Sequence, residues 1–330
     1  MTRSDPLSVA ALRLAALALC IPALVLSLPA WSQAYPSRPV RIVVPAVAGG
    51  GLDVMARFLS PKLTDYWNQP VVVENRPGAN FIVGTDAVAK AAPDGYTLLL
   101  VSTGALTVAP AVYPDLPYNV QRDLTPITLA ASNPFVLVVN SALPVNSVQD
   151  FIAYLRANPG KLNHATNSSA TLILASELLK SLAKVDYTDV NYKGAPQAVL
   201  STVTGESHFC LIDYGSAVAA IRGGRVRPIA MTSPQRNRLQ PNLPAIAEGV
   251  PGYASLAWIV ALAPAKTSPE IIARLHADIV RALALPEITQ RFESVGAEVL
   301  ASSPEEAAQV LRADTEKWTR LVKERNIRVQ

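Results

Sequence analysis

Three loops in the sequence place small or polar residues directly before a helical pattern, an arrangement that can bind an anion. The first loop, residues 45–53, reads Pro-Ala-Val-Ala-Gly-Gly-Gly-Leu-Asp. Glycine lets backbone N–H groups approach a ligand closely, and the positive end of the following helix points to the same place. A carboxylate there would accept charge-assisted hydrogen bonds worth roughly 1.5–3 kcal/mol each. The loop therefore predicts an anion site, with a flexible strand–helix turn as the alternative.

The other two loops are residues 75–84 (Asn-Arg-Pro-Gly-Ala-Asn-Phe-Ile-Val-Gly) and 167–171 (Asn-Ser-Ser-Ala-Thr). Their amide and hydroxyl groups can bind ligand oxygen atoms. Asp213 ends a predicted strand and precedes Tyr-Gly-Ser, so it is either a helix N-cap or an acceptor for a ligand hydroxyl or ammonium group. Each feature alone is common in loops, but three helix-opening loops together favour a ligand site.

Motifs for catalysis and cofactors are missing from the sequence. Val54 stands where a dinucleotide fingerprint needs its third small residue, and the glycine run lacks the Gly-Lys-Ser/Thr ending of a phosphate-binding loop. The chain has no His-Glu-x-x-His, Cys-x-x-Cys or Gly-x-Ser-x-Gly motif. We therefore expect a binding protein without cofactor or metal. A hydrolase that uses Asp213 and a bound water is the alternative, but no histidine adjoins Asp213 in the sequence.

The chain contains two cysteines. Cys20 lies in the N-terminal apolar segment, which leaves Cys210 alone in the rest of the chain. Because Cys210 stands in the apolar run 208–212, we expect a buried small hydrophobic residue and neither a disulfide nor a nucleophile.

The composition excludes a disordered chain, since 50% of the residues are hydrophobic and 16% are charged. Residues 1–34 combine a basic start, an apolar stretch at 14–30 and a small-residue cleavage site, which predicts a secretory signal peptide and a periplasmic location. A membrane anchor is the alternative, which Pro22 and Pro29 disfavour. Removing this segment takes away Arg3, Arg13 and Asp5, so the formal charge falls from +4 to +3. No basic cluster indicates nucleic-acid binding.

Short β-branched runs alternate with helical stretches along the rest of the chain, the pattern of an α/β fold with parallel strands. Strands are predicted at residues 40–44, 71–74, 97–101, 125–130, 135–140, 209–213 and 227–232. Helices are predicted at residues 52–67 (kinked or broken at Pro61), 83–91, 147–158, 171–182, 197–203, 268–285 and 303–324. We expect two lobes. The first comprises residues 35–132 and 233–330, and the second comprises residues 133–232, so the chain crosses between them twice. Two crossovers would place a ligand cleft between the lobes.

Several segments together resemble the Bug family of extracytoplasmic solute receptors. They are residues 35–45, the triple glycine with Asp53, residues 69–78 (Gln-Pro-Val-Val-Val-Glu-Asn-Arg-Pro-Gly), 87–96, 192–194, 230–233, 262–267 and 303–306. The resemblance runs from Tyr35 to the end of the chain. It implies a periplasmic-binding-protein-like fold whose two α/β lobes close on a small carboxylate. It also implies delivery of that solute to the permease subunits of a tripartite tricarboxylate transporter, with a periplasmic ligand sensor on the same fold as the alternative, and we expect a monomer.

The resemblance also assigns ligand-binding positions. In the family, backbone groups and waters at the first two loops hold the ligand carboxylate, and the second lobe supplies groups for specificity. The implied residues are Ala48, Gly49, Gly50, Gly51 and Leu52 in the first loop, Ala79, Asn80, Phe81 and Ile82 in the second, and Asn167, Ser168, Ser169, Thr171 and Asp213 in the second lobe.

Three departures from the family pattern bear on the solute. Ala46 stands where an aromatic residue is common, and Leu52 where threonine is common. The second-lobe loop lacks glycine, is one residue shorter and has Ile173 in place of a histidine. The resemblance therefore implies the class of ligand without identifying the acid.

Overall fold

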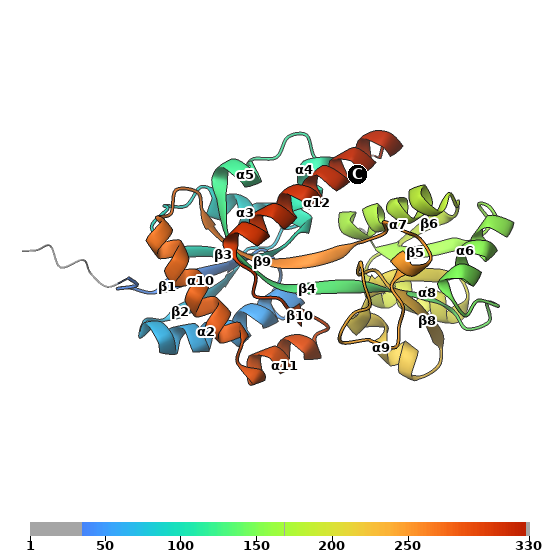
Figure 1. Cartoon of the computed structure of the whole chain (residues 1–330), viewed down its shortest axis with the longest axis horizontal. Coiled ribbons are helices and arrows are strands. Elements are labelled where there is room, and N and C mark those ends of the chain that lie inside the picture. The colour runs from blue at the N-terminus through green and yellow to red at the C-terminus, as the bar shows by residue number, and fades with distance from the viewer. Residues whose placement is uncertain (1–34, 168, 328–330) are drawn as a thin grey trace, which may run out of the picture. The chain divides into compact units, whose positions relative to one another are not determined.

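One sheet runs through the structure and is built around a single long strand, β4 (Leu124–Asn140). The computed structural model describes residues 35–167 and 169–327, so the predicted signal peptide and Ser168 lie outside the described residues. The strand order is β2-β1-β3-β9-β4-β7-β5-β6, with β8 and β10 also paired to β4. Helices lie on both faces of this sheet (Figure 1). The predicted α/β class is confirmed.

The two parts of β4 pair with different strands. Residues 124–134 pair antiparallel with β9 (Leu256–Pro264), and residues 135–140 pair with β7 (Phe209–Asp213) and β8 (Val226–Met231). Figure 1 shows β4 and β9 side by side through the middle of the molecule. The strands around residues 124–134 are called the first half-sheet here, and those around residues 135–140 the second.

Each half-sheet contains parallel strands whose carboxyl ends meet at one edge. In the first half-sheet, β1 (Val40–Val44) lies between β2 (Val71–Asn75) and β3 (Thr97–Ser102). In the second, β5 (Asn163–Asn167) lies between β6 (Thr188–Tyr192) and β7. A two-residue strand, β10 (Glu298–Val299), pairs with residues 131 and 132 of β4. The α/β units therefore bring their strand-to-helix loops to two common edges, where ligands bind in folds of this kind.

Seven helices among the described residues begin within two residues of their predicted starts, whereas no range was predicted for four others. The helices are α2 (Gly51–Trp67), α3 (Ile82–Ala89), α4 (Ala109–Val112), α5 (Val120–Asp123), α6 (Val148–Ala157), α7 (Ala170–Ala183), α8 (Ala195–Thr204), α9 (Tyr214–Arg222), α10 (Pro269–Leu283), α11 (Pro286–Ser294) and α12 (Pro304–Arg325). Those without a predicted range are α4, α5, α9 and α11. A π-helix occupies Gly104–Val108 and a short 3-10 helix Ile246–Glu248. None of the helices within residues 35–167 and 169–327 is long and apolar enough to cross a bilayer.

Helix α2 is not broken at Pro61, contrary to one reading of the sequence. It continues to Trp67, because Leu59, Leu63 and Trp67 keep one face buried and the Trp67 indole Nε1 donates a hydrogen bond to Asp278 Oδ2 at 2.7 Å. Pro61 itself is exposed, so its ring does not disturb that buried face. Tertiary packing here outweighs the hydrogen bond that proline removes.

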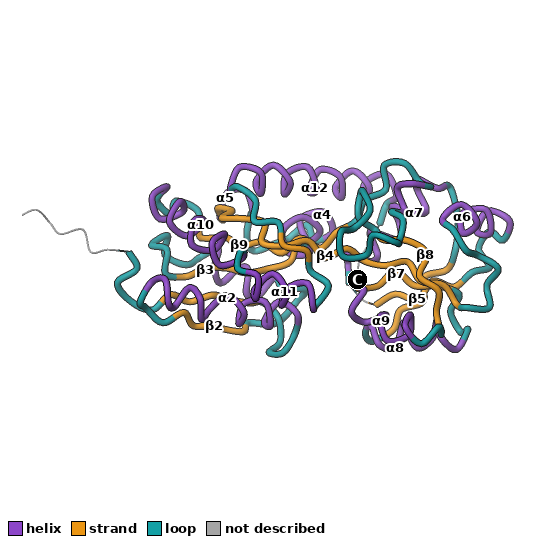
Figure 2. Tube along the Cα trace, turned by 60° about the horizontal axis from the view of Figure 1, so that its bottom comes forward, coloured by secondary structure: helices purple, strands orange, loops and turns teal. Residues whose placement is uncertain are grey.

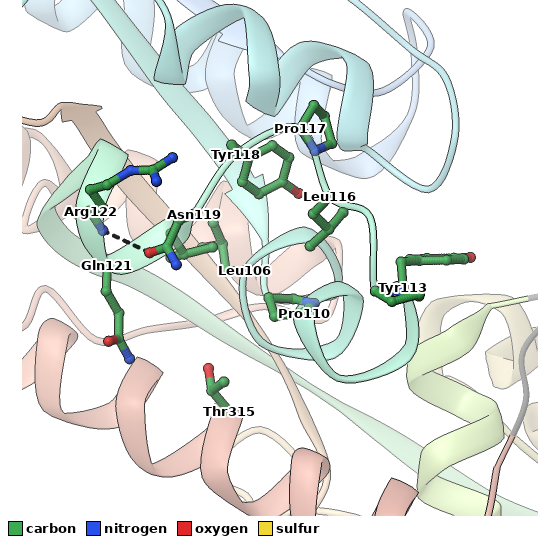
Figure 3. A pocket seen from close by; sticks show the side chains of 12 residues that line it. Leu106, Pro110, Tyr113, Leu116, Pro117, Tyr118, Asn119, Gln121, Arg122 and Thr315 are labelled. Atoms are coloured by element: carbon green, nitrogen blue, oxygen red, sulfur yellow. Dashed lines mark hydrogen bonds between the residues drawn. The ribbon is translucent and has the colours of Figure 1, made fainter.

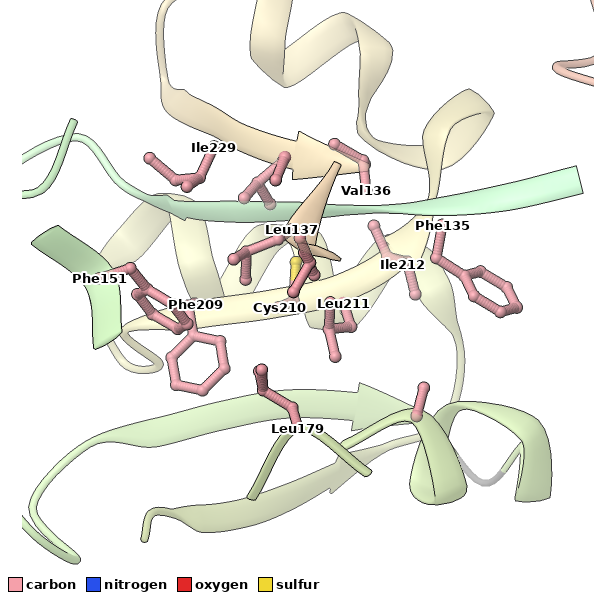
Figure 4. Packing of buried hydrophobic residues seen from close by; sticks show 14 of the residues in the cluster. Phe135, Val136, Leu137, Phe151, Leu179, Phe209, Cys210, Leu211, Ile212 and Ile229 are labelled. Atoms are coloured by element: carbon pink, nitrogen blue, oxygen red, sulfur yellow. The ribbon is translucent and has the colours of Figure 1, made fainter. Parts of the chain in front are cut away.

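The second half-sheet has its own buried core, shown in Figure 4. The rings of Phe151 and Phe209 pack edge to face with their centroids 4.9 Å apart, beside Leu137 and Cys210. Cys210 is fully buried and unpaired, and burial raises the pKa of its thiol to about 12. The prediction of a buried, unreactive cysteine is confirmed, since so high a pKa leaves almost no thiolate at neutral pH.

The packing of residues 233–253, which lie between β8 and β9, indicates the lobe to which they belong. Ile246, Val250 and Tyr253 pack into the same core as β7 and β8, and the strand that runs back along the first part of β4 is β9. The sequence analysis placed the return near residue 233, at the end of β8. The lobe boundaries stay a prediction, but these contacts associate residues 246–253 with the second half-sheet.

The C-terminal helix α12 connects the two cores. It begins with a capping box, in which Ser303 and Glu306 each accept from the other's backbone N–H. Ala307 and Leu311 pack in the core of the first half-sheet, whereas Trp318 and Leu321 pack in that of the second. Figure 2 shows α12 extended along one side of the sheet, across both parts.

Candidate solute-binding site

The glycine loop places unused backbone donors at the start of α2. The Gly49 N–H donates to Asp53 Oδ2 at 2.8 Å, and the Gly50 N–H donates to Val47 O at 3.1 Å. These two groups are therefore occupied within the loop. The N–H groups of Gly51 and Leu52, in the first turn of α2, find no acceptor among the described residues. An anion placed at this helix end would bind these two donors and the positive end of the helix dipole.

Asp53 links the glycine loop to α2 and to the end of β2 through its carboxylate. Its carboxylate is buried and accepts hydrogen bonds from Arg57 Nε and Asn75 Nδ2, both at 3.0 Å, besides the one from Gly49. The hydrogen bond from Arg57, with those from Gly49 and Asn75, outweighs burial and lowers the pKa of Asp53 to about 2. Asp53 is therefore ionised at neutral pH, and its charge is balanced by Arg57.

The second loop lies directly against the first. Asn75 Nδ2 also donates to Ala46 O at 3.1 Å, and the Arg76 N–H donates to Val44 O at 2.8 Å. Gly84 completes the contact, because a Cβ atom there would lie 2.7 Å from Cβ of Pro45 and 2.9 Å from the Arg76 carbonyl oxygen. The absence of a side chain at Gly84 therefore lets the start of α3 pack directly on Pro45, where β1 enters the glycine loop.

The backbone of the second loop is strained. Ala79, Asn80 and Phe81 follow each other with φ values of 44°, 51° and 72°, in the left-handed region. Such a conformation costs a residue other than glycine roughly 1–2 kcal/mol, somewhat less for asparagine. Asn80 Nδ2 donates to the Tyr113 hydroxyl at 2.8 Å, and Ile82 begins α3. Backbone strain of this kind clusters at binding sites.

The second half-sheet contributes the ends of β5 and β7. Asn167 ends β5 and accepts from the Ser169 N–H at 3.0 Å, and Ser169 is the N-cap of α7. Thr171, in the first turn of α7, is 7% exposed. Ser168 lies outside the described residues, so its assignment is not tested.

Asp213 has the N-cap role that the sequence left open. Its Oδ1 accepts from the Ser216 N–H at 2.8 Å, and its Oδ2 accepts from the Ser216 hydroxyl at 2.9 Å. No cation pairs with Asp213 among the described residues. It therefore caps α9 and leaves an uncompensated negative charge at the end of β7.

Gly104 joins the two halves of the site, and the sequence analysis did not identify it. A Cβ atom at Gly104 would lie 3.5 Å from Thr171 Oγ1 and 3.6 Å from Cδ2 of Phe81. The structure thus brings Phe81 and Thr171, from different half-sheets, to the same point. Gly104 opens the π-helix, a local irregularity frequent at functional sites. Its only sequence signal is a single glycine three residues after the end of the predicted third strand.

The convergence of the other predicted residues is not tested. Ala48 and Gly49 are exposed, and no hydrogen bond within residues 35–167 and 169–327 joins the glycine loop to Asn167 or Asp213. The proximity of the full set therefore remains a prediction, supported by the contact at Gly104.

A buried polar cluster supports β5 behind the site. The Leu211 N–H donates to His164 Nε2 at 3.2 Å, so Nδ1 carries the proton and donates to Asp189 Oδ1 at 2.6 Å. Burial would raise the pKa of Asp189, but the hydrogen bonds from His164 and Lys180 outweigh it and hold the pKa at about 2. His164 is completely buried, which assigns it to the structure of β5 rather than to ligand contact.

A cavity of about 420 Å³ lies beside the site, between residues 113–122 and α12. Figure 3 shows Leu116, Pro117 and Tyr118 on one side and Gln121 and Thr315 on the other. None of the predicted site residues lines it. Tyr113, which accepts from Asn80, forms its border with the second loop.

Comparison with known proteins agrees with the resemblance seen in the sequence. Residues 55–327 match the family model described as the tripartite tricarboxylate transporter family receptor. Protein BugT of Bordetella pertussis is 35% identical over 299 residues, covering 90% of this chain and 92% of BugT. A protein from Pseudomonas sp. strain P51, described as a "UPF0065 protein in tcbD-tcbE intergenic region", is 38% identical, covering 88% of each chain.

Two solved structures of Rhodopseudomonas palustris proteins are similar in fold and contain acids. Rpa4515 with adipate is 32% identical, with a TM-score of 0.73, covering 88% of this chain and 97% of that one. MatC with bound malate is 31% identical, with a TM-score of 0.71, covering 87% and 100%. The fold is accordingly that of TctC-type periplasmic binding proteins, and the role is solute binding. The chain belongs to the tripartite tricarboxylate transporter receptor family, as a Bug-type solute receptor.

Proposed function

We propose that this chain binds a carboxylate-bearing solute in the periplasm and delivers it to the permease subunits of a tripartite tricarboxylate transporter. The observation that supports a carboxylate ligand is made at the start of α2, where the Gly51 and Leu52 N–H groups have no acceptor among the described residues. Arg57 already balances the charge of Asp53 behind this point, so the helix end stays favourable for an anion. The acids in the two Rhodopseudomonas palustris structures support the same class of ligand.

The capture step we propose is closure of two lobes, one built on the first half-sheet and one on the second, with residues 246–253 in the second. The adjacent strands β4 and β9 would form the hinge, because they carry the chain between the half-sheets. Closure would bring the start of α2 opposite Asn167 and Thr171. We also propose that residues 1–34 direct export as a cleaved signal peptide and that the receptor is a monomer.

A thermal-shift screen of the purified protein tests the ligand class. A carboxylate present at about 100 times its Kd should stabilise the protein by about 2.7 kcal/mol, which corresponds to a rise in Tm of about 4 °C for a chain of this length. Mono-, di- and tricarboxylates should be compared with neutral solutes of the same size. If only neutral solutes raise the Tm, the carboxylate assignment is wrong.

Replacing Gly50 by valine should weaken carboxylate binding by tenfold or more. A Cβ atom at Gly50 would lie 3.1 Å from the Val47 carbonyl oxygen, so the branched side chain would crowd the loop beside the free donors of α2. Isothermal titration calorimetry would measure the change in Kd. Gly194→Val is the matched control, because Gly194 is the N-cap of α8 and its backbone is extended. Equal affinity of both variants would place the site elsewhere.

A further inference from the structure

We infer that the solute has a single carboxylate on an apolar body, and that Phe81 selects that body. This inference rests on the proposed function and narrows the class of acid. It is carried by three properties of the site: exposed apolar side chains, the strained backbone at Phe81 and the distribution of charge.

Apolar side chains stand beside the free donors of the first half-sheet. Val47 is 64% exposed in the glycine loop, and Val83 is 50% exposed in the first turn of α3. Phe81 lies between them in the chain and packs beside Gly104. We call Val47, Phe81 and Val83 the apolar wall. Single exposed valines are ordinary on a protein surface, but these two stand on the two loops that flank the predicted carboxylate position. A hydrocarbon chain or ring on the solute would cover them.

The backbone conformation at Phe81 indicates that its position is functional. Phe81 has a φ of 72° and ends a run of three left-handed residues, a conformation that glycine would adopt without strain. The result is a phenylalanine ring beside Gly104, within reach of Thr171 from the other half-sheet. A glycine at this position would suit the backbone better but would provide no ring. The strain is therefore consistent with selection of the ring for ligand contact.

The loops that contain the predicted site residues offer no unpaired cation to a second carboxylate; the nearby loop cation is Lys193, which follows the edge strand β6 and has no ion pair among the described residues. Arg76 is the only cation in the loops 45–53, 75–84, 102–108, 167–173 and 213–216, and it pairs with Glu74. On the other side of the site, Asp213 bears a negative charge that no cation balances among the described residues. A carboxylate buried without a cation is costly, and one near Asp213 would also be repelled. A monocarboxylate avoids both effects.

Two matched pairs of acids test the inference by isothermal titration calorimetry on the mature chain. Hexanoate with adipate, and benzoate with terephthalate, share a body and differ in one carboxylate. At least one monocarboxylate should bind ten times or more tightly than its dicarboxylate partner. Equal or tighter binding of both dicarboxylates would overturn the inference and leave the proposed function standing. So would binding of polar acids such as malate with no binding of either pair. If no carboxylate binds, the proposed function fails as well.

Phe81→Gly separates a ligand-contacting ring from a structural one. Glycine relieves the left-handed φ but removes the packing of the ring against the core of the first half-sheet, so the Tm should fall modestly, while the affinity for the preferred monocarboxylate falls tenfold or more. Ala301→Gly is the matched control, since Ala301 has a φ of 53° outside the site and its replacement should leave the affinity unchanged. A lower Tm with unchanged affinity in Phe81→Gly would show that the ring only supports the fold.

A cation introduced into the apolar wall should reverse the preference. Val47→Lys adds an ammonium group beside the glycine loop and should raise the affinity for adipate relative to hexanoate by tenfold or more. Val72→Lys provides the control, because Val72 is 52% exposed on β2 and lies three residues before the end of that strand. If both lysine variants change the preference equally, the effect comes from net charge and the apolar wall does not contact the solute.

Discussion

Replacing Asp53 by alanine is expected to lower the free energy of unfolding by about 2–4 kcal/mol and to abolish carboxylate binding. The buried carboxylate accepts from the Gly49 N–H, Asn75 Nδ2 and Arg57 Nε, so its loss leaves the Gly49 N–H without its acceptor, removes one of the two acceptors of Asn75 Nδ2 and leaves half-exposed Arg57 to water. It also removes the side chain that holds the two site loops together. Urea denaturation would measure the stability, and calorimetry the affinity.

The pH dependence of this variant gives a second check with a defined sign. The pKa of Asp53 is about 2 in the folded protein, below its ordinary value of 3.8. A carboxyl group with a lowered pKa stabilises the fold fully above about pH 4, and its contribution is lost as the pH falls toward 2. The stability difference between wild type and Asp53→Ala should therefore be constant near neutral pH and shrink below about pH 4. A difference that grows as the pH falls would contradict the assigned role of Asp53.

Gly84→Ala is expected to destabilise the protein by about 1–3 kcal/mol and to weaken binding strongly, although it adds only one methyl group. That methyl carbon would lie 2.7 Å from Cβ of Pro45 and 2.9 Å from the Arg76 carbonyl oxygen, neither of which can rotate away. The start of α3 would have to move from Pro45, and Phe81 would move with it. Thermal unfolding and calorimetry would report the two effects.

The same substitution in another first turn is the control for Gly84. Gly215 lies in the first turn of α9, and a Cβ atom there would only approach Asp213 Oδ1, at 3.6 Å. Gly215→Ala should leave the stability unchanged or raise it by about 0.5–1 kcal/mol, the usual gain in a helix. If both variants unfold alike, close packing on Pro45 is not the reason for glycine at position 84.

The strands that the sequence revealed are rich in β-branched and apolar residues, including the half-exposed edge strand β2. Residues 40–44 and 97–101 read as continuous apolar runs, and they form β1 and β3 as predicted. In contrast, β5 and β6 read Asn-His-Ala-Thr-Asn and Thr-Asp-Val-Asn-Tyr, compositions that disfavour a strand. The pair of buried His164 and partly exposed Asp189, which spans β5 and β6, satisfies polar groups that a local pattern cannot show to be paired.

Strand β9 escaped prediction for another reason. Its sequence, Leu-Ala-Trp-Ile-Val-Ala-Leu-Ala-Pro, is rich in alanine and carries no turn signal that sets it apart. Only pairing with residues 124–134 of β4 and with β3 defines it. The sequence could therefore predict that the chain crosses between two units and returns, but not which strand makes the return.

The site was predictable to the extent that its chemistry is local. The glycine loop and the N-cap geometry of Asp213 follow from residue types within a few positions. Gly104 could not be found in this way, because its role depends on Phe81 and Thr171, which are distant in sequence. The left-handed run at Ala79, Asn80 and Phe81 was equally hidden, since none of these residues is the glycine that normally marks such a backbone.

The most direct test of the central claim is a crystal structure of the mature protein grown with a saturating short-chain monocarboxylate. We predict that the carboxylate oxygens lie within hydrogen-bonding distance of the Gly51 and Leu52 N–H groups, with the hydrocarbon part against Phe81. A carboxylate bound in the cavity bordered by Tyr113 instead, with the start of α2 unoccupied, would contradict the account.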